Sequence, residues 1–268
     1  MIKLILSDMD GTFLNREGDF NRPLFKELKQ LLKETGVVFA PCTGKQCERI
    51  EELFGPEDAK DLWILGDSAT RIKHNGEYVY QSLLPNELGL RIIKKLEEIS
   101  KEYTIIACTP TAAIVKKSIS DDELKIVKGS YAKVIQVDDL NEIKEDFVKI
   151  TIYDKKLQCF KTREKLAEFF DSAYIVASEA AWIDISNLNV HKGTTVEKLQ
   201  EMLAIDFEET MVFGDGLNDV ELMERGAFSF AMRDGFEETK EAANYIIRTN
   251  EDDSVMKTII QILSLQKK

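Results

Sequence analysis

Histidine is scarce in this sequence. Its 268 residues include only His74 and His191, which are too few for a histidine-rich zinc centre and which disfavour a histidine-based mechanism. The four cysteines also lack the paired spacing of a metal site. Because a chain of this length does not need disulfide bonds to hold its fold, we expect four reduced, buried thiols.

Positive charge and long apolar runs are lacking as well. The chain has 36 Lys and Arg against 48 Asp and Glu, a formal net charge of −12. This balance disfavours a nucleic-acid partner, because nucleic-acid binders usually match phosphates with a basic face. The apolar runs are too short for a membrane span, and the first residues show no leader-like pattern. We therefore expect a cytoplasmic protein; the sequence sets no oligomeric state.

Strand and helix patterns alternate at both ends of the chain. Strands are predicted at 2–6, 37–40, 62–65, 103–108, 112–116, 148–153, 183–185, 211–213 and 228–231, and helices at 22–34, 46–54, 86–101, 160–170, 194–203, 219–224, 237–243 and 254–265. The alternation predicts an α/β fold whose Rossmann-like core has a parallel sheet. The different order in the middle predicts an inserted α+β module. We place the core at 1–84 and 186–268, and the insert, which the resemblance described below implies to be a cap domain, at 85–185.

Two acidic residues directly follow the first predicted strand. Asp8 and Asp10 belong to the sequence Asp-Met-Asp-Gly-Thr, immediately after the apolar run 2–6. Residues two apart in an extended segment project to the same side, and ligands of open α/β sheets bind at the carboxyl ends of the strands. Both carboxylates can therefore face one bound group, and two such acids in a pocket need a cation.

A second acidic cluster follows the strand predicted at 211–213. It reads Gly-Asp-Gly-Leu-Asn-Asp and places Asp215 at a strand end, where it could meet Asp8. Hard oxygen ligands in such numbers suit Mg²⁺. Without a cation, carboxylates brought this close would raise one another's pKa.

Two weaker signals lie between these clusters. Thr43 and Gly44 end the second predicted strand, and Lys192 with Gly193 begins a helix. A hydroxyl and exposed amides can hold phosphate oxygens, and an ammonium can neutralise the group in transfer. Alone, a Thr-Gly pair is usually a turn, and such a lysine is usually a surface residue. Here, however, every cluster lies where an α/β sheet collects its ligand.

In this order the four segments resemble the motifs of the haloacid dehalogenase (HAD) superfamily, and the insert after the third strand resembles the C2B-type cap of its Cof-type subfamily. The resemblance extends over nearly the whole core; in the cap it rests on element order alone. It implies that Asp8 is the nucleophile and Asp10 the general acid/base, and that the catalytic Lys192 neutralises charge and binds phosphate. Thr43 and Gly44 are implied to bind phosphate, and Asn218 either to contact phosphate or to support its loop. The implied Mg²⁺ ligands are Asp8, the carbonyl of Asp10, Asp215 and Asp219, the last either directly or through water.

The resemblance further implies a hydrolase acting on phosphoric monoesters. We expect a Mg²⁺-dependent phosphatase of small phosphorylated metabolites, with sugar phosphates as the leading class, that works through an aspartyl-phosphate. A sugar phosphomutase or a phosphatase of a single sugar phosphate would use the same core. A non-catalytic phosphate-binding or regulatory protein is the alternative of another class. A P-type ATPase fragment is disfavoured, because Asp10 replaces the lysine typical there.

The sequence departs from the Cof-type pattern in two places. Lys45 follows the Thr-Gly pair, where arginine is common, and lysine loses bidentate geometry. Gly66-Asp67-Ser68-Ala69 replaces the usual Asn-Gly-Ala after the third strand. Cys42, next to Thr43, is expected to be a packed thiol, because a phosphatase cysteine needs a basic loop to stabilise its thiolate.

The insert offers no readable code for specificity, although substrate choice should reside mainly there. We expect Trp182, Phe160 and Tyr153 to fill the cap core and the acidic residues 121–123 to form a solvated loop. His191 could line the pocket or lie on the surface near the joint, and both interpretations remain open.

Overall fold

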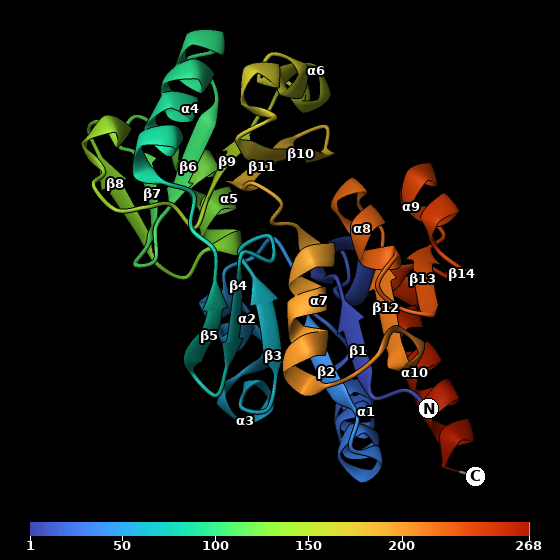
Figure 1. Cartoon of the computed structure of the whole chain (residues 1–268). Coiled ribbons are helices and arrows are strands. Elements are labelled where there is room, and N and C mark those ends of the chain that lie inside the picture. The colour runs from blue at the N-terminus through green and yellow to red at the C-terminus, as the bar shows by residue number, and fades with distance from the viewer. Residues whose placement is uncertain (268) are drawn as a thin grey trace.

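A five-stranded parallel sheet forms the centre of the α/β core (Figure 1). In the computed structural model, which describes residues 1–267, the strand order is β14-β13-β12-β1-β2. These strands are β1 (Leu4–Ser7), β2 (Val38–Pro41), β12 (Thr210–Gly214), β13 (Phe228–Met232) and β14 (Tyr245–Ile247). The predicted α/β class with a parallel core sheet is therefore confirmed. Strand β14 was not predicted.

Side chains alternate between the two faces of this sheet, and helices cover both. The core helices are α1 (Arg22–Thr35), α7 (Lys192–Leu203), α8 (Val220–Met223), α9 (Glu237–Ala242) and α10 (Ser254–Gln266). Ile5 packs with residues of α1 and α10, whereas Leu4 and Leu6 pack with residues of α7 and α8. Burial on both faces explains why β1 reads as a continuous apolar run.

The register of the sheet brings three loops together. Ser7, the last residue of β1, lies opposite Pro41 of β2 and Phe213 of β12. The residues that follow these strands therefore leave the sheet side by side. This edge is where the acidic motifs and the Thr-Gly pair were predicted to meet.

The third predicted strand belongs to a separate antiparallel sheet. Strands β3 (Trp63–Gly66), β4 (Arg71–His74) and β5 (Glu77–Gln81) pair in that order, and a single parallel bridge between Cys42 and Leu65 continues the line of β2. Asn75 and Gly76, both with positive φ, make the tight turn between β4 and β5. Helices α2 (Cys47–Phe54) and α3 (Pro56–Ala59) precede this sheet. Strands β4 and β5 were not predicted.

A second large sheet lies beside the core (Figure 1). Its strand order is β10-β11-β9-β6-β7-β8. Its strands are β6 (Thr104–Cys108), β7 (Ala113–Lys116), β8 (Val134–Val137), β9 (Lys149–Tyr153), β10 (Ala173–Glu179) and β11 (Trp182–Asn187); its helices are α4 (Asn86–Ile99), α5 (Asp121–Ser130) and α6 (Cys159–Glu164). We refer to residues 85–185 as the cap, and this division of the chain remains our proposal.

Three predictions for the cap differ from the structure. Residues 121–123 form the first turn of α5, which Ser120 caps reciprocally with Glu123, instead of a loop. The helix predicted at 160–170 is the short α6 followed by a 3₁₀ turn at Ala167–Phe169. Strands β8 and β10 were not predicted. No helix within residues 1–267 is both long and apolar enough to cross a membrane.

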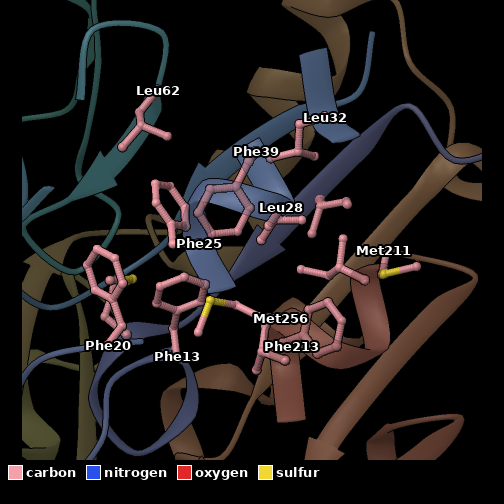
Figure 2. Close-up of a cluster of buried hydrophobic side chains, with 14 of the residues drawn as sticks. Phe13, Phe20, Phe25, Leu28, Leu32, Phe39, Leu62, Met211, Phe213 and Met256 are labelled. Atoms are coloured by element: carbon pink, nitrogen blue, oxygen red, sulfur yellow. The ribbon is translucent and has the colours of Figure 1, made fainter. Parts of the chain in front are cut away.

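Aromatic rings fill the core between the sheet and helices α1 and α10 (Figure 2). Phe25 of α1 lies at the centre of this cluster and is 2% exposed. Its ring centroid lies 5.1 Å from those of Phe20 and Phe54, and 6.1 Å from that of Phe13. Such edge-to-face pairs add to the free energy gained by burying apolar area.

Phe25→Ala should lower the free energy of unfolding by about 3–5 kcal/mol, because it leaves a cavity among rings that cannot collapse into it. Urea denaturation would measure the loss. Phe160→Ala is the matched control. Phe160 was predicted to fill the cap core, but it lies on the short helix α6 and is 42% exposed, so its truncation should cost below about 0.5 kcal/mol. Equal losses in the two variants would contradict this account of the core.

Candidate active site

Asp8 lies at the carboxyl end of β1, on the floor of a cavity between the core and the cap. Its backbone N–H donates to the carbonyl of Phe213 at 2.9 Å, which continues the pairing of β1 with β12. The residue is 8% exposed. Asp8 thus presents a carboxylate to the cavity from a rigid strand end.

Lys192 connects Asp8 to the second acidic cluster. It is the first residue of α7, and its Nζ donates to Asp8 Oδ1 at 2.7 Å and to Asp219 Oδ1 at 2.6 Å. The Lys192 side chain is 2% exposed. A charge buried this deeply is destabilising unless it is paired, and the two carboxylates provide that pairing. Burial alone would lower the pKa of Lys192, but the carboxylates of Asp219 and Asp8 outweigh burial and raise the pKa well above its usual range.

The loop after β12 holds its two aspartates in place. The second oxygen of Asp219 accepts the backbone N–H groups of Asp215 and Gly216, both at 3.0 Å. Asp215 accepts the hydroxyl of Thr12. Gly11 is required beside it, because its φ is +75° and a Cβ there would lie 2.4 Å from Asp215 Oδ2.

Three carboxylates are close enough to share a cation. One oxygen from each of Asp8, Asp215 and Asp219 lies within 4.8 Å of the others. Burial, then repulsion from neighbouring carboxylates, raises the pKa of Asp215 to about 7 and that of Asp8 well above its ordinary value. A single ammonium among three carboxylates leaves excess negative charge. The donor set therefore fits a hard divalent ion such as Mg²⁺.

Asp10 lies apart from that trio of carboxylates. Its side chain is 60% exposed, lines the cavity, and pairs with Lys45 Nζ at 2.9 Å. The carboxylate can therefore face a substrate. The group that Asp10 could offer to a metal is its backbone carbonyl. The lysine that departs from the Cof-type pattern thus contacts the predicted acid/base residue.

The predicted phosphate-binding residues are distributed around the same cavity. Gly44 and Asn218 line it, whereas Thr43 is 1% exposed, and its hydroxyl accepts the backbone N–H of Lys45 at 3.1 Å. Thr43 thus shapes the loop from behind, and we refer to residues 43–45 as the phosphate loop. Lys192 also lies behind the cavity wall, in contact with Asp8.

The cavity has a volume of about 680 Å³ and is lined by both parts of the molecule. The cap contributes polar and aromatic side chains that the sequence analysis did not assign to the site. They include Lys149, Thr151, Glu179, Trp182 and Asp184. Their separation along the chain leaves no motif; only the pairing of β9, β10 and β11 brings them together. Trp182, predicted to fill the cap core, packs against Tyr153 but also faces the cavity.

The remaining sulfur and imidazole groups fit structural roles. All four cysteines are unpaired and buried, as predicted. Burial raises the pKa of Cys42 to about 12, so it carries no thiolate near neutral pH. His191 holds the N-cap position of α7, where its backbone N–H donates to the Thr194 hydroxyl at 3.1 Å, and its ring lies 5.2 Å from that of Tyr174.

Comparison with known proteins finds relatives that are described as hydrolases or phosphatases. A family model described as haloacid dehalogenase-like hydrolase matches residues 5–259. The chain is 28% identical to the 5-amino-6-(5-phospho-D-ribitylamino)uracil phosphatase YbjI of Escherichia coli, over 98% of this chain and 96% of the relative. It is 27% identical to the phosphatase YcsE of Bacillus subtilis, named for the same substrate, over 96% and 94% of the two chains.

Solved structures show the same fold. SMU.1108c from Streptococcus mutans superposes with a TM-score of 0.93 at 25% identity, over 98% of this chain and all of the other. BT4131, described as a HAD subclass IIB sugar phosphatase, has a TM-score of 0.80 at 19% identity, over 97% and 98% of the two chains. At 19% identity, the likeness to BT4131 shows a shared fold and nothing further.

Proposed function

Because this chain belongs to the haloacid dehalogenase-like hydrolases, we propose that it is a Mg²⁺-dependent phosphatase of small phosphorylated metabolites that uses Asp8 as nucleophile. One observation carries the proposal. The Asp8 carboxylate faces the cavity, is bound by Lys192 at 2.7 Å, and shares a cluster with the carboxylates of Asp215 and Asp219. A buried carboxylate at a strand end, next to a fixed ammonium, is suited to attack an electrophile.

In the first step, an oxygen of Asp8 attacks phosphorus while the bond from phosphorus to the leaving oxygen breaks. Asp10, which reaches the cavity with an exposed carboxyl group, gives its proton to that oxygen. The product is an aspartyl-phosphate and a free alcohol. Lys192 stabilises the negative charge between Asp8 and the phosphoryl oxygens, and the phosphate loop and Asn218 hold those oxygens.

In the second step, water attacks the phosphorus of the aspartyl-phosphate. Asp10, now ionised, takes the proton from that water and returns to its starting form. The Asp8 carboxylate is the leaving group, and inorganic phosphate is released. One residue therefore serves as acid and then as base, so it must stay accessible to water.

Asp8, Asp215, Asp219 and the carbonyl of Asp10 are the groups that would hold Mg²⁺. When bound, the ion offsets the repulsion between the Asp8 carboxylate and the phosphate dianion. Asp219 stays fixed by two backbone N–H groups, and Asp215 by Thr12. The pocket therefore keeps its shape between the two steps.

The cap wall favours an uncharged, hydroxylated leaving group. The carboxyl groups of Asp10, Glu179 and Asp184 all line the cavity, and burial, then the charges of Asp10 and Asp184, raise the pKa of Glu179. The charges of Asp10 and Asp184 would repel a second anionic group on the substrate. Hydroxyl groups can donate to Asp184 and Glu179. Sugar phosphates fit this description, and so does the phosphorylated ribityl chain of the substrate named for two relatives.

Phosphate release from a panel of sugar and polyol phosphates, with Mg²⁺ present, tests the proposal directly. Turnover of several members would support it. No turnover on the whole panel would favour the non-catalytic alternative instead. Product analysis with and without an acceptor sugar separates hydrolysis from phosphoryl transfer between sugars, because a phosphomutase would yield an isomeric sugar phosphate. A cytoplasmic location remains a prediction.

Asp10→Asn should lower kcat for a sugar phosphate by about 10²–10⁴-fold, because an amide can neither protonate the leaving oxygen nor activate water. Formation of the aspartyl-phosphate from p-nitrophenyl phosphate should be less affected, because that leaving group does not need a proton, whereas the second step is slowed for both substrates. Steady-state phosphate release measures kcat, and a rapid burst of p-nitrophenol release measures the first step. Asp138→Asn is the matched control, since Asp138 is an exposed cap carboxylate that pairs with Lys117. Full activity of Asp10→Asn would remove the acid/base assignment.

A further inference from the structure

Lys149 lies on cap strand β9, but two of its three hydrogen-bond acceptors belong to the core. Its Nζ donates to Asp184 Oδ1 at 2.9 Å within the cap, to Ser68 Oγ at 2.8 Å, and to the carbonyl of Gly44 at 2.9 Å. An ammonium has three N–H groups, and all three are used. The side chain is 3% exposed, so the ammonium is largely shielded from water although Lys149 borders the cavity.

The two core acceptors belong to one bonded unit. The backbone N–H of Ser68 donates to the Thr43 carbonyl at 3.0 Å, and that of Asp67 donates to the Lys45 carbonyl at 2.7 Å. Asp67, Ser68 and Ala69 have φ of 56°, 60° and 59°, a left-handed run that non-glycine residues adopt only where the surroundings hold it. Lys149 therefore contacts the phosphate loop directly and through this turn.

On the cap side, the acceptor borders the substrate cavity. Asp184 lies on β11, its side chain is 11% exposed, and it lines the cavity. A hydroxyl on a leaving group can donate to its carboxylate. A hydroxyl group that donates to Asp184 would bind the same carboxylate that fixes Lys149. Lys149 in turn contacts the phosphate loop, so it links Asp184 to this loop.

Docking of the cap does not depend on Lys149 alone. The end of α5 also meets the start of α2: the Gln46 N–H donates to the Ser130 carbonyl at 3.0 Å, and the Ala132 N–H donates to Gln46 Oε1 at 3.0 Å. Arg49 Nε donates to the Gly129 carbonyl at 3.2 Å. Loss of the Lys149 ammonium would therefore leave the cap in place while releasing Gly44.

We propose that Lys149 is a positioning residue that couples recognition of the leaving group by the cap to the geometry of the phosphate loop. This inference rests on the proposed phosphatase function. Lys149 does not touch phosphorus and transfers no proton. It holds the Gly44 carbonyl in a fixed direction when Asp184 is itself fixed by a bound leaving group. Substrates with a hydroxylated leaving group then have a higher kcat, because the contact stabilises the transition state more than it stabilises the bound substrate.

The test compares two substrates in three variants. One substrate is the best sugar phosphate of the panel, and the other is p-nitrophenyl phosphate, which has no hydroxyl group on its leaving group. In Lys149→Met and in Ser68→Ala, kcat for the sugar phosphate divided by kcat for p-nitrophenyl phosphate should fall by about tenfold or more, because only a leaving group that bonds Asp184 uses the contact through Lys149 to align the phosphate loop. Lys117→Met, an exposed cap lysine, should leave the ratio within about twofold.

Each outcome decides the inference. A lower kcat ratio in both variants, with the KM of the sugar phosphate little changed, supports coupling. An unchanged ratio, an equal loss on both substrates, or a change in KM alone overturns it, and so does the absence of any sugar-phosphate preference in the wild type. Circular dichroism checks folding, and Ser68→Ala keeps the test valid if Lys149→Met does not fold. An inactive wild-type protein would instead refute the proposed function.

Discussion

Asp8→Asn should abolish hydrolysis of phosphate monoesters, lowering kcat by about 10⁴-fold or more. The amide has no anionic oxygen to attack phosphorus, and no other group can replace it. Cys42 is the nearest alternative nucleophile in sequence to the phosphate loop, but burial raises its pKa to about 12. Phosphate release by purified variant and wild type, on the same sugar phosphate with Mg²⁺, measures the loss.

The variant should keep its fold, because the Lys192 ammonium retains Asp219 Oδ1 as an acceptor at 2.6 Å. Circular dichroism and thermal unfolding provide the control. A second measurement is independent of turnover: rapid acid quenching followed by mass spectrometry should detect one added phosphoryl group on the wild type and none on the variant. Substantial turnover by Asp8→Asn, or a phosphorylated residue other than Asp8, would contradict the mechanism.

Removal of divalent cations should lower activity by about 10³-fold, because a metal ion supplies several kcal/mol of charge stabilisation to such a transition state. The cluster of Asp8, Asp215 and Asp219 is the reason to expect this dependence. Dialysis against a chelator, followed by phosphate-release assays with and without added Mg²⁺, measures it. Restoration by Mg²⁺ controls for unfolding, and full activity of a metal-free sample would contradict the assignment.

The same cluster predicts proton release when the ion binds. In the metal-free protein, burial and neighbouring carboxylates raise the pKa of Asp215 to about 7, so this group is about half protonated at neutral pH. A cation competes with that proton, and its affinity should therefore weaken as the pH falls below about 7. Calorimetric titration of Mg²⁺ in two buffers with different ionisation enthalpies would detect the proton; identical heats would contradict the prediction.

The parallel core could be predicted because its signals are local. The apolar run 2–6, its acidic ending and the later helical patterns each lie within a few residues of one another. Strands β4 and β5 were missed, since RIKH and EYVYQ place at most three apolar or aromatic residues together between charged or polar ones. Strand β14 was missed because it has only three residues, too few to give a periodic pattern.

The core half of the site could be predicted for the same reason, and the cap half could not. Asp8 and Asp215 follow strand ends directly, so sheet topology places them together once the strands are recognised. Lys149 and Asp184 sit within strands that read as ordinary cap sheet, and they meet only because β9 pairs with β11. A buried lysine in an apolar strand is itself a signal, because its charge must find partners.

The catalytic strand depends on residues that are far away in the sequence. Strand β1 pairs with β12 on one side, and Gln266 of α10 bonds the N–H and the carbonyl of Ile2, so the two ends of the chain lie together (Figure 1). During translation, the middle of the chain, which has its own apolar core, leaves the ribosome before these partners exist. The nascent cap can therefore fold before β1 gains β12 as its neighbour, and the active site is assembled only after β12 has been synthesised.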